Sequence, residues 1–263
     1  MKEYTMPCRP ALIVALGTSC SGALAQFEPV DLTAVYNTDR HLSCCDSWQY
    51  PLGNATYLGI PFFLGPETGN NSVFMDGVNP VVTDIQIDRV GVQRVRTLLN
   101  TAWGQPGPAS YLRIEFHGVD SSVYAIDLVG NVHIRDHGPC CTAFIDPNPP
   151  TCTRNVWVSS SGQVRADMQT FALPAAIRSG GLDFVRFIDN GAIGFQRGYL
   201  FAMTLDYSLC EANINDDCIV DFFDYLDFVA RYANEDQEAD FNADGVIDFF
   251  DYLDFAQAFS EGC

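Results

Sequence analysis

The chain has 263 residues, enough for one full-sized domain and a smaller second unit. Its 33 Asp and Glu residues outnumber its 14 Lys and Arg residues, which gives a formal net charge of −19. A chain this acidic repels polyanions, so nucleic acids and anionic membrane surfaces are poor partners for it.

Residues 1–25 have the pattern of a secretory signal peptide. Lys2 and Arg9 supply the basic end, an apolar run begins at Ala11, and Ala23-Leu24-Ala25 forms a small-x-small cleavage site. The apolar run is too short and too interrupted to span a membrane. We therefore expect an exported protein, secreted or at the cell surface, with no membrane span.

Eight cysteines follow the predicted signal peptide. They are Cys44, Cys45, Cys140, Cys141, Cys152, Cys210, Cys218 and Cys263. An exported chain with this inventory is expected to form disulfides, and the CxxC pairs typical of a zinc site do not occur. The first five are expected to staple loops of the larger domain, in a connectivity that the sequence leaves open.

Residues 26–208 alternate between short apolar segments and turn signals, which predicts an all-β domain. The clearest segments are 81–87, 92–99, 111–116, 123–128, 164–171, 184–188 and 199–207. Leu112, Ile114 and Phe116 are expected to face inward, and alternate residues from Tyr199 to Tyr207 are expected to share one face. Many short strands at regular spacing predict a two-sheet β-sandwich, in particular a jelly roll.

Parts of this domain resemble the galactose-binding-like jelly rolls of the NPCBM type. The similar segments are 30–37, 58–62, 99–104 and 111–116. Modules of this type occur beside carbohydrate-active enzymes, so the resemblance implies a glycan ligand. Trp103, beside a Gly- and Pro-rich loop, and Tyr111 are the candidate glycan contacts, because sugar sites use exposed aromatic faces. The alternative is that these rings belong to the core or plug loops.

No motif in this domain predicts catalysis. His133 and His137 are four residues apart but lack the Glu of an HExxH zinc site. GxSxG does not occur, and the acidic residues show no paired pattern of the kind a glycosidase needs. We therefore expect a protein that is not an enzyme.

Residues 213–224 recur as residues 240–251, and both copies continue into Tyr-Leu-Asp-Phe. The offset of 27 residues indicates a duplicated supersecondary unit. Oxygen-bearing side chains and one backbone carbonyl recur at the loop spacing that surrounds Ca²⁺, with Gly245 at the tight turn of the second copy. The candidate ligands are Asp240, Asn242, Asp244, Val246, Asp248 and Asp251 in the second copy, and Asn213, Asn215, Asp217, Ile219, Asp221 and Asp224 in the first.

Two such loops, each followed by one helix, resemble a type I dockerin. Cys210 and the terminal Gly262-Cys263 resemble the GC-type dockerins of secreted bacterial proteins. The resemblance implies a module at residues 209–263 that binds Ca²⁺ and tethers the chain to a protein partner, cohesin-like or another surface protein. A Cys210–Cys263 disulfide is expected to close its two ends. The alternative is an acidic helical hairpin without metal.

The two loops are expected to differ in affinity. The second has four carboxylates, whereas the first has three, with Asn213 at position 1. Cys218 also takes position 6 of the first loop, where a positive φ favours glycine. We therefore expect residues 240–251 to bind Ca²⁺ more tightly.

Aromatic residues replace the small polar side chains that cohesin-binding dockerins usually carry at loop positions 10 and 11. Phe222, Leu226 and Val229 are spaced as one helical face, which predicts core. The remaining aromatics of the two copies form either further packing against a neighbour or an apolar docking patch. The docking candidates are Phe223, Phe228, Phe250 and Phe255.

The complete chain is thus expected to be mainly β, a jelly-roll-like β-sandwich followed by a small α-helical unit with duplicated calcium loops. Two functions fit this organisation. The first is a tethered binding protein whose sandwich holds carbohydrate. The second is a structural or adhesive extracellular component without a small ligand.

Overall fold

The computed structural model describes residues 27–40, 50–76, 81–102, 107–130, 132–138, 153–160, 162, 164–189, 197–207, 212–215, 220–242 and 244–261, without the side chains of 76, 107–111 and 261. The predicted signal peptide, all ten cysteines and Trp103 lie outside these residues, as do two candidate calcium ligands, Asp217 and Ile219.

The described chain is mainly β, as predicted. Its strands are β1 (Phe27–Pro29), β2 (Asn54–Tyr57), β3 (Ile60–Phe63), β4 (Val73–Asp76), β5 (Val81–Arg89), β6 (Arg94–Ala102), β7 (Gly107–Gly118), β8 (Val123–Gly130), β9 (Thr153–Val158), β10 (Arg165–Ala172), β11 (Leu182–Asp189) and β12 (Arg197–Asp206). Each of the predicted strand segments overlaps one of them. A short helix, α2 (Ala175–Gly180), precedes β11.

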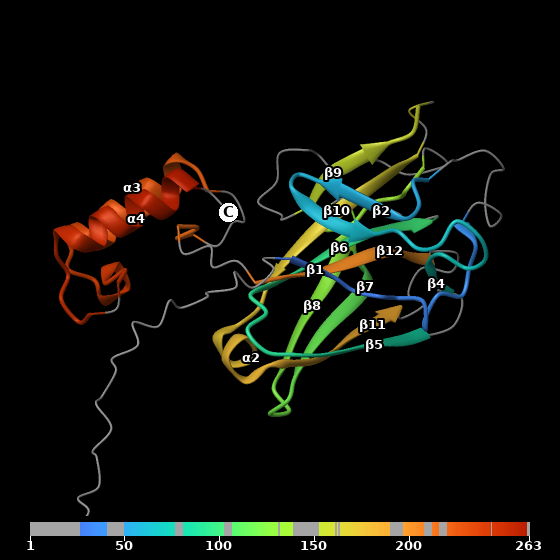
Figure 1. Cartoon of the computed structure of the whole chain (residues 1–263), viewed down its shortest axis with the longest axis horizontal. Helices are drawn as coiled ribbons and strands as arrows, with labels where there is room; N and C mark the ends of the chain where they lie inside the picture. The colour runs from blue at the N-terminus through green and yellow to red at the C-terminus, as the bar shows by residue number, and fades with distance from the viewer. Residues whose placement is uncertain are drawn as a thin grey trace, which may run out of the picture.

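Two antiparallel sheets form the bulk of the structure (Figure 1). One has the order β1-β12-β6-β10-β9, with β4 also paired to β12. The other has the order β5-β11-β7-β8. Apart from β7–β8 and β9–β10, the neighbours in these sheets are not consecutive in sequence, so the chain crosses repeatedly between the two sheets.

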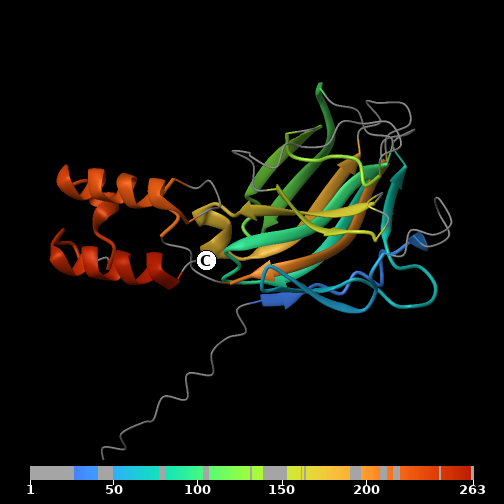
Figure 2. The same cartoon turned by 90° about the horizontal axis from the view of Figure 1, so that it is seen from above.

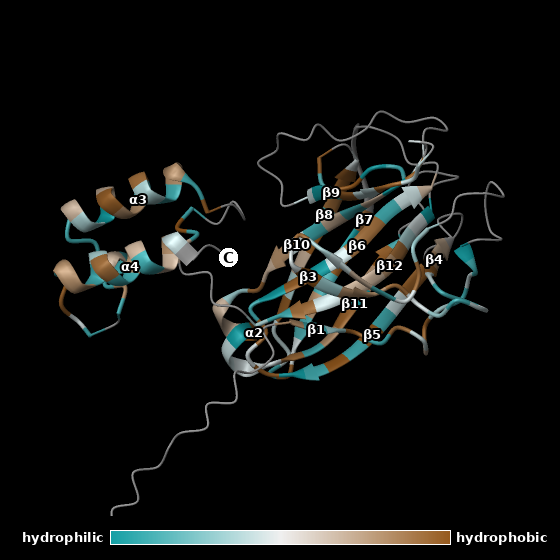
Figure 3. Ribbon diagram, turned by 45° about the horizontal axis from the view of Figure 1, so that its top comes forward, coloured by the Kyte–Doolittle hydropathy of each residue, from teal (hydrophilic) through white to brown (hydrophobic). Residues whose placement is uncertain are grey.

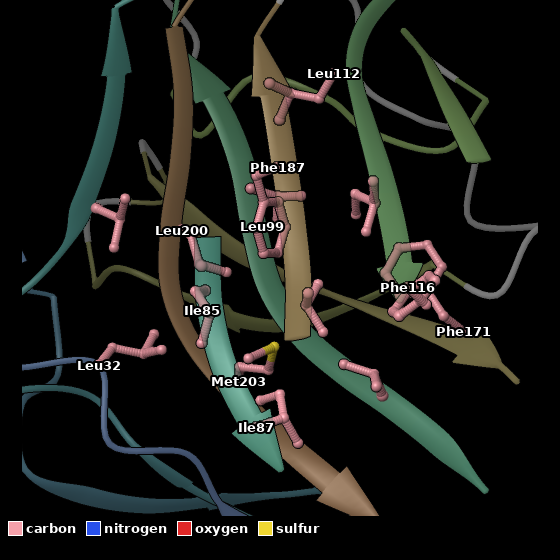
Figure 4. Close-up of a cluster of buried hydrophobic side chains, with 14 of the residues drawn as sticks. Leu32, Ile85, Ile87, Leu99, Leu112, Phe116, Phe171, Phe187, Leu200 and Met203 are labelled. Carbon is pink, nitrogen blue, oxygen red and sulfur yellow. The ribbon is translucent and has the colours of Figure 1, made fainter. Parts of the chain in front are cut away.

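The main hydrophobic core fills the space between the two sheets (Figure 4). Leu99, Leu200 and Met203 come from one sheet, and Phe116 and Phe187 from the other. All five side chains are fully buried or nearly so. Burying each contributes about 1.5–3 kcal/mol relative to leaving it in water. Leu112, Ile114 and Phe116 face inward, as their alternation predicts.

A second core lies on the other face of the first sheet, under the β2–β3 hairpin. Ile60, Phe62 and Leu98 belong to it, together with Tyr199 and Phe201. The ladder between β12 and β6 shifts register between Leu200 and Ala202, and such a bulge changes the face on which the following side chains point. The single shared face predicted from Tyr199 to Tyr207 is therefore wrong, since Met203 and Leu205 lie in the main core.

Arg40 fixes the segments around this second core. Its guanidinium is buried and donates to the backbone carbonyls of Asn71, Pro51 and Leu64. Burial lowers its pKa to about 10, so the group remains charged at neutral pH. The ring of Phe201 lies 5.3 Å from the guanidinium carbon and supplies a π face to this charge.

The C-terminal residues form helices with a small core of their own. Helices α3 (Phe222–Ala233) and α4 (Phe249–Glu261) lie side by side (Figure 2), with the 3₁₀ helix η1 (Gln237–Ala239) between them in sequence. Hydrophobic residues recur along both helices (Figure 3). Among the residues that the structure describes, no helix is long and apolar enough to cross a membrane.

Candidate functional site

The two repeated loops share one hydrogen-bond pattern. Asp251 and Asp224, the last residues of the two loops, are both fully buried. Asp251 Oδ1 accepts from the Asn242 N–H at 3.2 Å and Oδ2 from the Asp248 N–H at 2.7 Å. Asp224 accepts from the residues 27 positions earlier, Asn215 at 3.2 Å and Asp221 at 2.9 Å. In each copy one carboxylate therefore ties the start of the loop to the start of the helix.

The helix starts are duplicated as well. Asp221 is the N-cap of α3 and accepts from the Phe223 N–H at 2.8 Å, and Asp224 reaches back to the Asp221 N–H to complete a capping box. Asp248 accepts from the Phe250 N–H at the same distance of 2.8 Å. These bonds satisfy amide groups that a helix leaves without partners in its first turn.

The front half of the second loop is a tight turn built on its own acidic side chains. Gly245 has φ of +87°, a conformation that glycine adopts without strain. Asp240 accepts from the N–H groups of Asp244 (3.0 Å) and Gly245 (2.9 Å), and Asp244 accepts from Val246 at 2.9 Å. The predicted ligand side chains thus line the inside of one turn.

The electrostatics of Asp251 follow from its surroundings. Burial alone would raise the pKa of this carboxyl, but the backbone N–H groups of Asp248, Asn242 and Phe241 stabilise its charged form and hold the pKa below its usual range. A carboxylate that stays charged while buried, with further lone pairs, is a suitable anchor for a cation.

The chemistry of the donor set fits a hard cation, although the oxygens are not gathered into a cluster. Among the described residues, no group of three or more His, Cys, Asp or Glu side chains is arranged to hold a metal ion. Binding would therefore require Asp240, Asp244 and Asp248 to turn from backbone amides toward a shared ion. Asn213 Oδ1, at position 1 of the first loop, is buried without a hydrogen-bond partner in the described structure. An ion or water is the usual partner of such an atom.

The helix faces differ from the sequence prediction. Phe222, Leu226 and Val229, predicted as core, are exposed by 64%, 45% and 36%. Phe228 and Phe255, predicted to dock a partner, are fully buried against each other, so a partner cannot reach them. The core face of α3 instead runs along Tyr225, Phe228 and Tyr232, also at helical spacing. Asp224 determines which face of α3 packs into the core, because its side chain must point inward to bond the N–H groups of its own loop.

Phe223 and Phe250 are exposed, at 64% and 63%. They keep the accessibility that a docking residue needs. Nothing in the described part of the chain covers either ring, so both remain candidates alongside the exposed stripe that contains Phe222.

The candidate sugar site of the sandwich lies largely outside the described residues. Trp103 and the side chain of Tyr111 are not among them. Tyr50 is buried, with its ring 5.3 Å from that of Trp157 and its hydroxyl 2.6 Å from His137 Nδ1. His133 has a different partner, because its Nδ1 accepts from the Val129 N–H at 3.0 Å. The two histidines therefore do not converge on one site.

The sandwich also contains a buried polar cluster that was not predicted from the sequence. Asp167 is fully buried and pairs with Arg135, with 2.6 Å between Nη2 and Oδ1, and it accepts from Asn100 Nδ2 at 2.8 Å. These residues come from β6, β10 and a loop, and no local spacing links them. The signal that was available is the charged Asp167 within the predicted strand 164–171, since a charge buried in a sheet needs a partner.

Comparison with known proteins adds no family to this picture. A scan against protein-family models finds no match to the chain, and a search of curated proteins finds no similar sequence.

Proposed function

We propose that this chain is an exported, non-catalytic protein whose C-terminal module, residues 209–263, folds around Ca²⁺ and tethers the protein to a partner, in the manner of a dockerin. The observation that carries the proposal is the duplicated bonding of Asp224 and Asp251. Each loop has one carboxylate that caps the following helix and one buried carboxylate that turns back into the loop. This repetition supports an ion-binding role in both copies over a plain helical hairpin.

In the second loop the ion would be held by Asp240, Asn242, Asp244, Asp248 and Asp251 and by the carbonyl of Val246. In the first loop the corresponding set is Asn213, Asn215, Asp217, Asp221 and Asp224 with the carbonyl of Ile219. Ca²⁺ would supply a positive charge that offsets the repulsion among these acidic side chains. The buried, unpartnered Oδ1 of Asn213 supports a cation in the first loop also.

The sandwich is proposed to be the ligand-binding part, with carbohydrate as the ligand class. The strand orders β4-β12-β6-β10 and β5-β11-β7-β8 support jelly-roll connectivity, which sugar-binding modules share with many other proteins. A glycan array probed with the full chain tests this part. Binding that Trp103→Ala abolishes supports it, and no binding to any glycan favours a structural or adhesive role.

The calcium proposal is tested by titration calorimetry and circular dichroism on the full chain. Ca²⁺ is expected to bind with heat, increase the helical signal at 222 nm and raise resistance of the C-terminal residues to protease. The double variant Asp240→Asn/Asp251→Asn is the control and is expected to lose the response of the second loop. If chelator leaves the helical signal and the protease resistance unchanged, the proposal is wrong.

A further inference from the structure

Four aromatic rings form a row across α3 and α4. Phe222 stacks beside Tyr225 with ring centroids 6.1 Å apart, and Phe249 stacks beside Tyr252 at the same distance of 6.1 Å. The Tyr225 and Tyr252 side chains lie close enough for Tyr252 to raise the pKa of Tyr225, so the two halves meet at these tyrosines. The row therefore runs from one repeat to the other without a break.

The row is part of a larger apolar face. Phe222 and Phe249 are exposed by 64% and 61%. Leu226 and Leu253, one helical turn further along their helices, are exposed by 45% and 44%, and Val229 continues the stripe on α3. We call these residues, together with the half-buried Tyr225 and Tyr252 at the border of the core, the aromatic face. Large apolar side chains gathered on a surface are typical of an interaction site.

Acidic residues surround the aromatic face. Asp227 and Asp254, which lie outside both proposed calcium loops, directly follow its two leucines, whereas Asp221 and Asp248 beside its outer rings are proposed Ca²⁺ ligands. Within the described residues, no salt bridge engages any of these four carboxylates. Residues 211–263 contain fifteen Asp and Glu and a single base, Arg231, which pairs with Glu238 at 2.6 Å. The net charge of this segment is therefore −14.

This charge selects among the possible occupants of the face. A second copy of the chain would bring the same negative charge into contact, −14 without Ca²⁺ and −10 with one Ca²⁺ in each loop, and like charges across an interface oppose association. An anionic lipid surface is disfavoured for the same reason. A protein with Lys or Arg around an apolar patch can bury the rings under that patch and pair its cations with the carboxylates.

We propose that the aromatic face is the docking surface for a partner protein that presents an apolar patch edged by basic side chains. This inference rests on the proposed tether function and specifies the chemistry of its partner. Because the row includes rings from both repeats, the partner contacts α3 and α4 together, and loss of Phe222 and Phe249 weakens binding more than loss of either alone.

The test uses the full chain with Ca²⁺ and a defined probe. The probe is a fluorescent helical peptide with leucine on one face and lysine on the other, and its counterpart carries glutamate in place of lysine. The variant Phe222→Ser/Phe249→Ser removes the outer rings of the aromatic face. The comparison variant Phe223→Ser/Phe250→Ser removes the two other exposed candidate rings, which lie about 100° further around each helix, and so decides between the two candidate docking faces. Neither variant changes the charge.

Fluorescence anisotropy is expected to show binding of the lysine peptide and none of the glutamate peptide. Phe222→Ser/Phe249→Ser is expected to weaken binding about 100-fold, and the comparison variant by less than about threefold. No effect of either variant would mean that charge alone attracts the peptide, and equal losses would mean that Phe223 and Phe250 contribute as much as the aromatic face. Either result would overturn the inference. A concentration-dependent dimer that Phe222→Ser/Phe249→Ser abolishes would overturn it in favour of self-association, and binding to phosphatidylcholine vesicles in favour of a lipid surface.

Calcium calorimetry on the same samples separates this inference from the proposed function. If Ca²⁺ binds and the helices are folded but the lysine peptide does not bind, only the docking inference fails. If Ca²⁺ neither binds nor changes the helical signal, the proposed function fails whatever the peptide does.

Discussion

Phe228 and Phe255 lie face to face at the centre of the helical pair, with ring centroids 4.0 Å apart and ring planes 4° apart. They occupy the same position in the two repeats, 27 residues apart. Phe241 meets both rings edge-on, at 6.1 and 5.7 Å. A duplicated sequence has thus produced a symmetric contact in which each repeat completes the core of the other, so neither helix has its core without its partner.

Phe255→Ala is expected to lower the free energy of unfolding of the helical pair by about 3–5 kcal/mol, because it leaves a cavity against Phe228. Phe250→Ala, at an exposed position of the same helix, is the control and is expected to change it by less than about 0.5 kcal/mol. Urea unfolding followed at 222 nm measures the helices, and tryptophan fluorescence follows the sandwich separately because all three tryptophans precede residue 208. Equal costs for the two variants would contradict the central role of the Phe228–Phe255 pair.

The predicted difference in Ca²⁺ affinity between the two loops can be tested by removing one carboxylate from the second loop and adding one to the first. Asp240→Asn leaves the second loop with three carboxylates, and Asn213→Asp gives the first loop four. If the loops bind Ca²⁺ as proposed, the number of ligand charges sets their affinity for it. The first change is then expected to weaken the proposed tighter site about tenfold and the second to strengthen the proposed weaker one. Calorimetry on each variant measures the two sites. If Asp240→Asn affects only the weaker site, the ranking of the loops is reversed.

The strands could be predicted because alternation is a local property. Leu112, Ile114 and Phe116 are separated by residues of the outer face, and the structure buries all three. The bulge after Leu200 could not be predicted, because it depends on how β12 pairs with β6. The same limit applies to Asp167 and Arg135, whose contact joins residues 32 positions apart.

The loops were predictable from the repeat, but the face of the following helix was not. Both Phe222-Leu226-Val229 and Tyr225-Phe228-Tyr232 satisfy helical spacing. What decides between them is the direction in which Asp224 must point to bond the N–H groups of its own loop. A polar constraint, which a hydrophobic pattern does not contain, therefore oriented the helix.

The buried pair Arg135–Asp167 is expected to be far more sensitive than an exposed pair. Arg135→Met leaves the fully buried carboxylate of Asp167 without its charge partner and is expected to cost about 3–5 kcal/mol. Arg113→Met is the matched control, because the side chains of Arg113 and its partner Asp127 are 42% and 56% exposed, which predicts a cost of about 0–1 kcal/mol. Urea unfolding followed by tryptophan fluorescence compares the two. Similar costs would show that Asp167 finds other partners or takes up a proton.

His137 gives the sandwich a defined dependence on pH. Burial lowers its pKa to about 4, whereas the unfolded chain is expected to titrate near the ordinary value of 6.5. Between these values the unfolded state binds more protons, so the contribution of His137 is complete above about pH 6.5 and is lost as the pH falls toward 4. At pH 5 the loss is about 2 kcal/mol.

His137→Asn is expected to remove this part of the pH dependence. The variant is less stable at pH 7 because Tyr50 loses the nitrogen 2.6 Å from its hydroxyl, but its free energy of unfolding falls by about 2 kcal/mol less than that of the unaltered chain between pH 7 and pH 5. Urea unfolding at the two pH values, followed by tryptophan fluorescence, gives the difference directly. Carboxylates titrate equally in both proteins and cancel in the comparison. An unchanged pH dependence in the variant would show that His137 can be protonated inside the folded sandwich at little cost, for example because the adjoining Tyr50 turns to accept the new proton.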